Sequence, residues 1–238
     1  MNLLAFDTST DTLSIAVQRD AHVWEHQGPG GAQSSSTLIP AIHTLMGQAG
    51  LRFAQLDAIA FGRGPGSFTG LRTACSIAQG LAFGAHVPVL PIDTLLAVAE
   101  QARAAHGCTE VVAVLDARMD EVYHAPYRWE ARDSGSGQWQ GEGDFGLCAP
   151  EAIPVPAGFV LAGNAAAAYG ERLAADAPTA QRLPALPTAT ALLRLAPALL
   201  AAGAAVPADQ ALPHYVRDKV AQTTAEREAA ARLRAAAA

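Results

Sequence analysis

The stretch from Phe61 to Arg72 has the sequence FGRGPGSFTGLR and separates a predicted strand from a predicted helix at residues 68–84. Backbone N–H groups at such a junction can bind an anion, and the helix N-terminus adds to the attraction. The stretch nevertheless lacks the lysine of a P-loop, and Gly64, Gly66 and Gly70 are spaced one residue too long for a dinucleotide-binding fingerprint. We therefore favour a structural role, in which the glycines permit a tight turn and close helix packing, over phosphate binding.

A strand meander and a helix are predicted before this stretch. Three short apolar segments joined by polar turns have the lengths of antiparallel strands, at residues 3–7, 11–17 and 21–26. Apolar residues then recur at helical spacing between Ser34 and Ala49. A serine at the start of this segment would cap the helix, and Gly50 would end it.

The pattern repeats after the helix at 68–84. A strand at 87–90 and a helix at 94–105 complete the first half of the chain. A strand that ends in an acidic residue and a second strand after a turn then follow, as at the start of the chain, at residues 111–116 and 121–129. The repetition predicts an α/β protein of two related lobes, each a mixed sheet flanked by helices, at residues 1–105 and 106–220.

The rest of the second half has weaker patterns. Residues 131–144 are rich in Gly, Ser and Gln and predict a flexible surface loop. Helices are predicted at 165–174 and 188–202, and Pro197 predicts a kink or break in the second of them. The tail at 221–238 is rich in alanine, glutamate and arginine and is expected to be a frayed helix or disordered.

The composition restricts the classes of function. The chain of 238 residues is half apolar and has a formal net charge of −6, without the basic excess that binds nucleic-acid phosphates. Three cysteines without a CxxC pair predict reduced thiols. No segment has the pattern of a signal peptide or the length of a membrane helix. Together these features predict a cytoplasmic protein.

Five stretches of the chain resemble the bacterial TsaB family, also called YeaZ. They occur in the family's order: FDTST at 6–10, FGRGPGSFTGLRTACSIAQGLAFG at 61–84, PIDTLLAVAE at 91–100, VVAVLDARMDEVYHAPY at 111–127 and PHYVRDKVA at 213–221. The part GRGPGSFTGLR is highly specific to this family. The resemblance implies an actin-like (ribonuclease H-like) fold and a role in making threonylcarbamoyladenosine on tRNA.

The resemblance further implies a subunit without catalytic residues of its own, a degenerate paralogue of the threonylcarbamoyltransferase TsaD. The chain would bind TsaD, join a ternary complex with TsaE, and form a homodimer through the same surface when isolated. It would use no cofactor and would not bind tRNA tightly by itself. At residues 91–96, where the paralogue is expected to carry paired histidines for a metal, this chain has no histidine. We therefore expect no metal site.

A nucleotide site is the main alternative. In actin-like ATPases, a turn with glycine wraps the phosphates after the strands that correspond to those ending in Asp7 and Asp116. Both turns lack glycine here, which argues against ATP turnover. Residual nucleotide contacts remain candidates, at Asp7, Arg63, Gly64, Gly66, Ser67 and Arg118. The competing interpretations are that the Asp7 carboxylate caps the turn and that Arg63 and Arg118 form ordinary ion pairs.

A metalloprotease is a third possibility and has little support in the sequence. His22 and His26 form an HxxxH pattern, but they fall in a predicted strand, where residues four apart lie ~13 Å apart. That separation is too large for two rings to bind one metal ion.

The helices at 34–49 and 68–84 are the predicted partner surface. Small residues alternate between Ala74 and Gly84 and would permit another helix to approach closely. The candidate contact residues are Leu38, Ile42, Leu45, Leu71, Cys75 and Ala78. Burial of the same residues in the protein's own core is the alternative.

Overall fold

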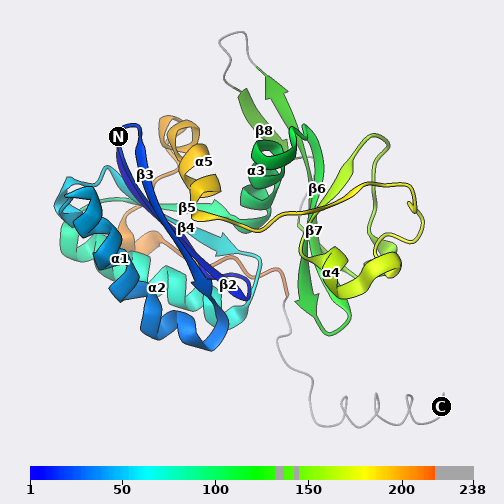
Figure 1. The fold of residues 1–238 in the computed structure, drawn as a ribbon, viewed down its shortest axis with the longest axis horizontal. Coiled ribbons are helices and arrows are strands. Elements are labelled where there is room, and N and C mark those ends of the chain that lie inside the picture. The colour runs from blue at the N-terminus through cyan, green and yellow to red at the C-terminus, as the bar shows by residue number, and fades with distance from the viewer. Residues whose placement is uncertain (132–136, 142–144, 218–238) are drawn as a thin grey trace.

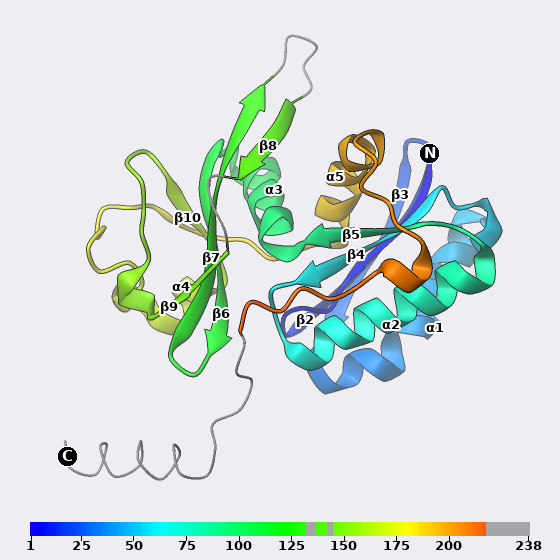
Figure 2. The same ribbon diagram turned by 180° about the vertical axis from the view of Figure 1, so that it is seen from behind.

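The computed structural model describes residues 1–131, 137–141 and 145–217, so the predicted tail at 221–238 lies outside the described residues. The described chain forms two lobes side by side, each built on one β-sheet (Figures 1 and 2). Within these ranges, no helix combines the length and apolar character needed to cross a membrane.

The sheet of the first lobe begins with the predicted meander. β1 (Asn2–Asp7), β2 (Thr12–Arg19) and β3 (His22–Pro29) pair antiparallel. β4 (Ala58–Gly64) and β5 (Val89–Asp93) extend the sheet in parallel from β1, which gives the order β3-β2-β1-β4-β5. β1 is buried along almost its whole length because helices cover both faces of the sheet.

Two pairs of helices cover the faces of this sheet. The two predicted helices, α1 (Ser34–Ala49) and α2 (Phe68–Ala85), lie side by side on one face (Figure 1). α3 (Thr94–His106) and α5 (Ala189–Ala201) cover the other face. Phe6 packs in the first of these cores and Ala5 in the second, since successive residues of a strand point to opposite faces.

The ends of α1 and α2 follow the expected local signals in part. Ser67 caps α2 by accepting a hydrogen bond from the Gly70 N–H, and Gly50 ends α1 in the left-handed conformation with φ of 62°. The predicted serine cap of α1 is wrong. No side chain caps this helix, because a 3₁₀-helical turn at Gly31–Gln33 leads directly into it.

The second lobe repeats the topology of the first. Its central hairpin is formed by β6 (Glu110–Arg118) and β7 (Glu121–Ala131). β10 (Val160–Gly163) and β11 (Arg182–Pro184) extend in parallel from β6, while β8 (Gly137–Gly141) and β9 (Gly146–Cys148) pair with β7. The order β8-β7-β6-β10-β11 and its strand directions match β3-β2-β1-β4-β5. This match confirms the predicted pair of related lobes.

Two local predictions in this lobe are wrong. Part of the predicted loop forms β8, because pairing with β7 brings Trp139 against Trp129 with ring centroids 5.4 Å apart. The other parts of that predicted loop, 132–136 and 142–144, lie outside the described residues. The predicted helix at 165–174 is shorter than expected. α4 spans Ala165–Tyr169, and Gly170 ends it with φ of 55°.

The chain returns to the first lobe after β11. α5 packs on β1, β2 and β4 and runs through Pro197 without the predicted break. Val206 then pairs with Val89 of β5, and residues 211–217 pass along α2 toward the second lobe (Figure 2). The last strand of the second sheet ends at Pro184, and α5, which follows it, packs on the first lobe. The predicted extent of the second lobe, 106–220, is therefore too long at its C-terminal end. The apolar face of α5 packs on the sheet of the first lobe.

Candidate functional site

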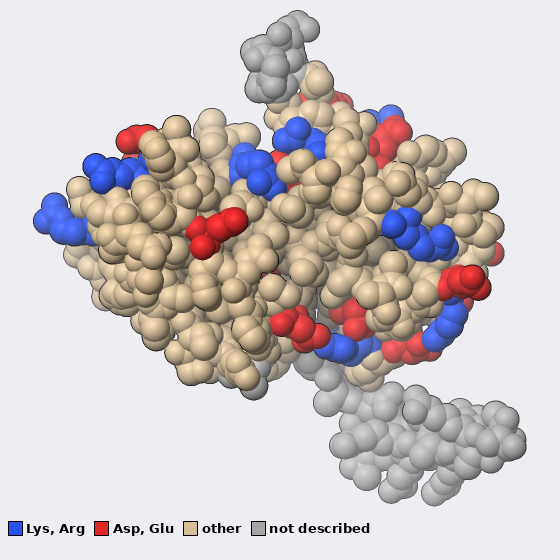
Figure 3. Space-filling view, in the orientation of Figure 1, with Lys and Arg blue, Asp and Glu red and all other residues tan. Residues whose placement is uncertain are grey.

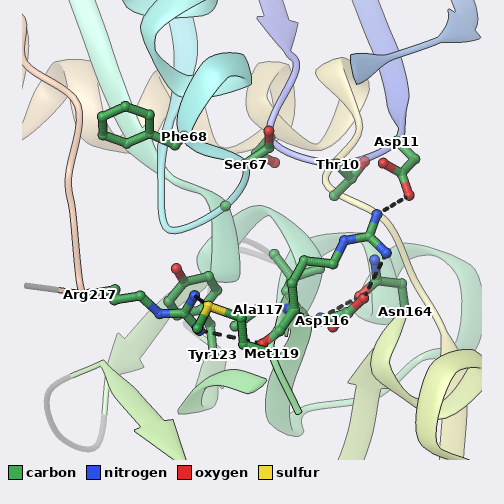
Figure 4. A pocket seen from close by; sticks show the side chains of 14 residues that line it. Thr10, Asp11, Ser67, Phe68, Asp116, Ala117, Met119, Tyr123, Asn164 and Arg217 are labelled. Carbon is green, nitrogen blue, oxygen red and sulfur yellow. Dashed lines mark hydrogen bonds and ion pairs between the residues drawn. The ribbon is translucent and has the colours of Figure 1, made fainter. Parts of the chain in front are cut away.

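A cleft of about 310 Å³ lies between the two lobes, and Figure 4 shows the side chains that line it. The first lobe contributes the turn after β1 and the start of α2, and the second lobe contributes the end of β6 and the β6–β7 turn. Three of the predicted nucleotide-contact residues come together here: Gly66, Ser67 and Arg118. The other three, Asp7, Arg63 and Gly64, do not line the cleft.

The glycine-rich stretch packs directly against the turn after β1. A Cβ atom on Gly66 would lie 2.6 Å from the Cβ of Ser9, and one on Gly70 would lie 1.9 Å from the carbonyl oxygen of Thr8. The Thr8 hydroxyl donates a hydrogen bond of 2.7 Å to the Gly70 carbonyl. These approaches require glycine, which supports close packing as the role of the stretch.

Three N–H groups of this stretch are already engaged within the protein. The Gly64 N–H donates to the Thr94 hydroxyl at 3.1 Å, and the Ser67 N–H donates to the Ser9 carbonyl at 2.8 Å. The Gly70 N–H donates to the Ser67 hydroxyl at 3.4 Å. These donors are therefore not available to a phosphate, in contrast to an anion-binding glycine loop.

Asp7 is buried beneath the cleft. The Ser9 N–H and hydroxyl donate to its Oδ1 at 2.8 and 2.6 Å, while its Oδ2 accepts no hydrogen bond from any described residue. Burial raises the pKa of Asp7 to about 6, although the two bonds from Ser9 lower it in part. The predicted role of Asp7 as a turn-capping carboxylate agrees with the bonds from Ser9.

The arginines near the cleft are paired with carboxylates. Arg118 lines the cleft and lies 2.7 Å from Asp11 and 3.3 Å from Asp116, so it joins the two lobes. Arg217 pairs with Glu121. Away from the cleft, Arg63 lies 2.6 Å from Asp93. The interpretation of Arg63 and Arg118 as pairing residues therefore holds in the described structure.

Asn164 and Arg217 are among the cleft residues that were not predicted from the sequence. Asn164 accepts a hydrogen bond of 2.9 Å from the Asp116 N–H, and it follows β10 where the second lobe repeats the junction of β4 and α2. The internal duplication is the signal that could have found it. Arg217 comes from the segment after α5. It lies within the stretch PHYVRDKVA at 213–221, which resembles the family but assigns no role to this arginine.

The six residues predicted to contact a partner are buried in the core of the first lobe. Their exposed fractions are between 0 and 5%, for Leu38, Ile42, Leu45, Leu71, Cys75 and Ala78. The choice of residues was wrong because helical spacing of apolar side chains marks the face that packs on the sheet. A partner surface on α1 and α2 remains a prediction for their opposite face.

The outer face of α1 and α2 is almost free of charge. Arg72 is the only Lys, Arg, Asp or Glu within the two helices. A shallow groove runs between the helices and is lined by uncharged residues and Arg72: Ser35, Ile39, Phe68, Thr69, Thr73, Ser76 and Ile77. In Figure 3 the surface over α1, at the lower left, shows no blue or red side chains.

The described residues contain no group of three or more His, Cys, Asp or Glu side chains placed to bind a metal ion. His22 and His26 lie on β3, in the extended conformation that was expected.

The chain is similar to proteins of known families. Residues 25–138 match the family described as TsaD: tRNA N6-adenosine threonylcarbamoyltransferase. The chain is 34% identical to the tRNA threonylcarbamoyladenosine biosynthesis protein TsaB of Escherichia coli (strain K12), over 93% of this chain and 96% of that protein. It is 42% identical to the protein of the same name from Haemophilus influenzae, over 63% of this chain and 65% of that protein.

Solved structures of YeaZ proteins are also similar to this chain. YeaZ from Pseudomonas aeruginosa superposes with a TM-score of 0.79 at 38% identity, over 90% of this chain and 99% of that chain. A second structure, described as an uncharacterized protein with similarity to peptidase YEAZ from Pseudomonas aeruginosa, has a TM-score of 0.80 at 37% identity, over 91% of this chain and 99% of that chain.

Proposed function

Because this chain belongs to the TsaB (YeaZ) family and has an actin-like (ribonuclease H-like) fold, we propose that it supports tRNA threonylcarbamoyladenosine biosynthesis as a non-catalytic subunit. In this proposal the chain binds the threonylcarbamoyltransferase TsaD, and the pair binds TsaE. TsaD carries out the transfer, and this chain supplies a docking surface. The observation that carries the proposal is the set of glycines on the outer face of α1 and α2.

Gly47, Gly80 and Gly84 have no packing reason within the described part of the chain. A Cβ atom on any of them would meet no described atom within 4 Å. Gly70 is the contrast, because a Cβ there would collide with Thr8. Glycine within a helix costs ~1 kcal/mol relative to alanine. A partner helix that approaches the backbone closely would account for these glycines.

The interlobe cleft supports the absence of catalysis. Three N–H groups of the glycine-rich stretch are engaged, the cleft arginines Arg118 and Arg217 are paired, and Asp7 is buried under the cleft. A nucleotide-dependent enzyme is the second candidate, and these contacts disfavour it. We expect no phosphate release when the purified chain is incubated with ATP and Mg²⁺. Hydrolysis that disappears in Asp7→Ala would favour the second candidate.

The docking proposal is tested by size-exclusion chromatography with light scattering, on the chain alone and mixed with its cognate TsaD. We expect a one-to-one complex, which Ser76→Arg and Gly80→Arg abolish because both residues are exposed on the outer face of α2. Val23→Arg is the matched control, since Val23 is exposed beside α5 on the opposite face of the sheet. Failure to associate, with or without TsaE and nucleotide, would refute the proposal.

A functional measurement accompanies the binding test. The modified nucleoside is quantified by mass spectrometry in a reaction reconstituted with TsaD, TsaE, tRNA and the activated threonylcarbamoyl donor. Omission of this chain is expected to abolish product, and Val23→Arg is expected to restore it fully. If Gly80→Arg no longer associates with TsaD but still gives full product, the activity does not depend on docking. That result would overturn the proposal that this chain acts as a docking subunit.

A further inference from the structure

Arg72 is held in one position on the outer face of α2. Its guanidinium carbon lies 3.7 Å from the centroid of the Phe68 ring, and its Nε donates a hydrogen bond of 3.1 Å to the Tyr215 hydroxyl. The Phe68 and Tyr215 rings are themselves in contact, with centroids 5.3 Å apart. This stack orders the guanidinium before any partner arrives, so less conformational entropy is lost on binding.

Tyr215 can order Arg72 because its own segment is fixed at both ends. The Gln79 side chain donates to the Ala211 carbonyl at 2.8 Å, and the His214 N–H donates to the Arg63 carbonyl at 2.7 Å. On the other side of Tyr215, Arg217 pairs with Glu121 of the second lobe. The aromatic support of Arg72 is therefore part of the folded protein.

The charge of Arg72 is not neutralised within the described residues. No described carboxylate lies within ion-pair distance of it, and its two terminal nitrogens donate no hydrogen bond to a described residue. The groove that it lines contains no acidic residue, and neither α1 nor α2 contains one. A planar guanidinium with free donors matches a carboxylate, which it can bind through two parallel hydrogen bonds.

We propose that Arg72 binds a carboxylate of a partner protein and thereby makes this face select an acidic partner over a second copy of the chain. This inference rests on the proposed docking function. A pair of identical faces would bring together two guanidinium groups and no carboxylate from α1 or α2, whereas a partner with Asp or Glu at this position neutralises Arg72. A single cation on a chain of net charge −6 does not favour the phosphates of a nucleic acid.

The experiment measures the Kd for cognate TsaD by titration calorimetry at several salt concentrations. Arg72→Gln is expected to weaken binding roughly 10- to 100-fold and to flatten the salt dependence, because a charge-assisted pair is lost. Arg128→Gln removes the same charge from an exposed site on β7 and is expected to leave Kd and its salt dependence nearly unchanged. Arg72→Lys retains the charge and should keep the salt dependence but lose affinity.

Self-association supplies the second measurement. In sedimentation experiments, Arg72→Gln is expected to self-associate at least as strongly as the parent chain, because no favourable charge pair is lost. An equal loss of self-association and TsaD binding would overturn the inference, as would an unchanged Kd. Weaker binding to tRNA alone would assign Arg72 to nucleic acid instead. If Gly80→Arg abolishes the complex and Arg72→Gln has no effect, the docking function survives and only this inference fails.

Discussion

A Cβ atom on residue 62 would lie 1.7 Å from Oδ2 of Asp7, so Gly62 leaves the space that this buried carboxyl oxygen occupies. The two residues extend the parallel pairing of β1 and β4 just beyond the paired Phe6 and Phe61. Gly62 therefore has a different role from the exposed glycines of α2. The interior of the first lobe leaves no space for a side chain at this position.

This contact predicts opposite effects for two glycine-to-alanine substitutions. Gly62→Ala is expected to reduce the free energy of unfolding by about 3 kcal/mol, because the new methyl group collides with Asp7. Gly84→Ala is expected to increase it by about 0.5–1 kcal/mol, because its methyl group meets open space on a helix. Urea unfolding measures both. In the double variant, Asp7→Ala should recover part of the stability that Gly62→Ala loses. If the changes in unfolding free energy of the two single variants simply add in the double variant, the proposed collision is contradicted.

Asp7 predicts a specific dependence of stability on pH. Its pKa is raised from 3.8 to about 6 in the folded protein, so the folded state binds more protons than the unfolded state between these values. Stability from this group is therefore present at low pH and lost as pH rises through about 6. The shift corresponds to roughly 3 kcal/mol. Asp7→Asn should be more stable than the parent at pH 8 but not at pH 4.

The measurement is urea unfolding of both proteins across this pH range. Their difference isolates Asp7 from the other titrating groups. A constant difference between pH 4 and pH 8 would contradict the raised pKa.

Glu100 is expected to be a main determinant of stability between the lobes. Its side chain is 2% exposed and accepts hydrogen bonds of 2.9 Å from Arg103 and Arg194 and of 3.0 Å from the Trp139 indole. These groups come from α3, α5 and β8. Removal of one partner from a buried ion pair costs about 3–5 kcal/mol. Glu100→Ala should lower the free energy of unfolding by this amount.

Glu130→Ala provides the comparison for Glu100. Glu130 is exposed on β7 and accepts a hydrogen bond of 3.3 Å from Gln140. Its removal should change stability by less than about 0.5 kcal/mol. Similar losses of unfolding free energy in Glu100→Ala and Glu130→Ala would show that the buried hydrogen bonds of Glu100 do not account for its effect on stability.

Gly80 is predicted to separate stability from partner binding. Gly80→Ala should raise the free energy of unfolding by about 1 kcal/mol, because alanine favours the helix and the new methyl group meets open space. The same methyl group should weaken binding to TsaD if a partner helix approaches the backbone there. Thermal unfolding and calorimetry give the two values. Unchanged binding would place the partner contact elsewhere on α2.

The order of strands and helices was largely predictable because the hydrophobic period changes clearly along the chain. The duplication was visible as two strands that end in Asp7 and Asp116. β8 was missed because its sequence is polar and rich in glycine, and its strand conformation depends on pairing with β7 and on contact between Trp129 and Trp139. Such tertiary stabilisation is not visible in a local pattern.

The site was less predictable than the fold. The helices of the candidate surface were identified, but the chosen side chains, such as Leu38 and Ala78, face the core. The apolar spacing of α1 marked the inner face, and the residues of the outer face had to be chosen from the other positions, where no charged side chains mark them. The pairing of Arg118 with Asp11 joins residues from different lobes, and sequence separation conceals such a contact. The support of Arg72 by Tyr215 was missed for the same reason.

The position of α5 determines how the molecule can be divided. This helix is encoded after the second lobe, yet its apolar side chains pack on the sheet of the first. A fragment ending near residue 105 would keep α3 but expose to water the part of its sheet that α5 covers, and the complementary fragment would carry a helix with no sheet to cover. The gene therefore encodes two repeated halves, neither of which is a self-sufficient folding unit.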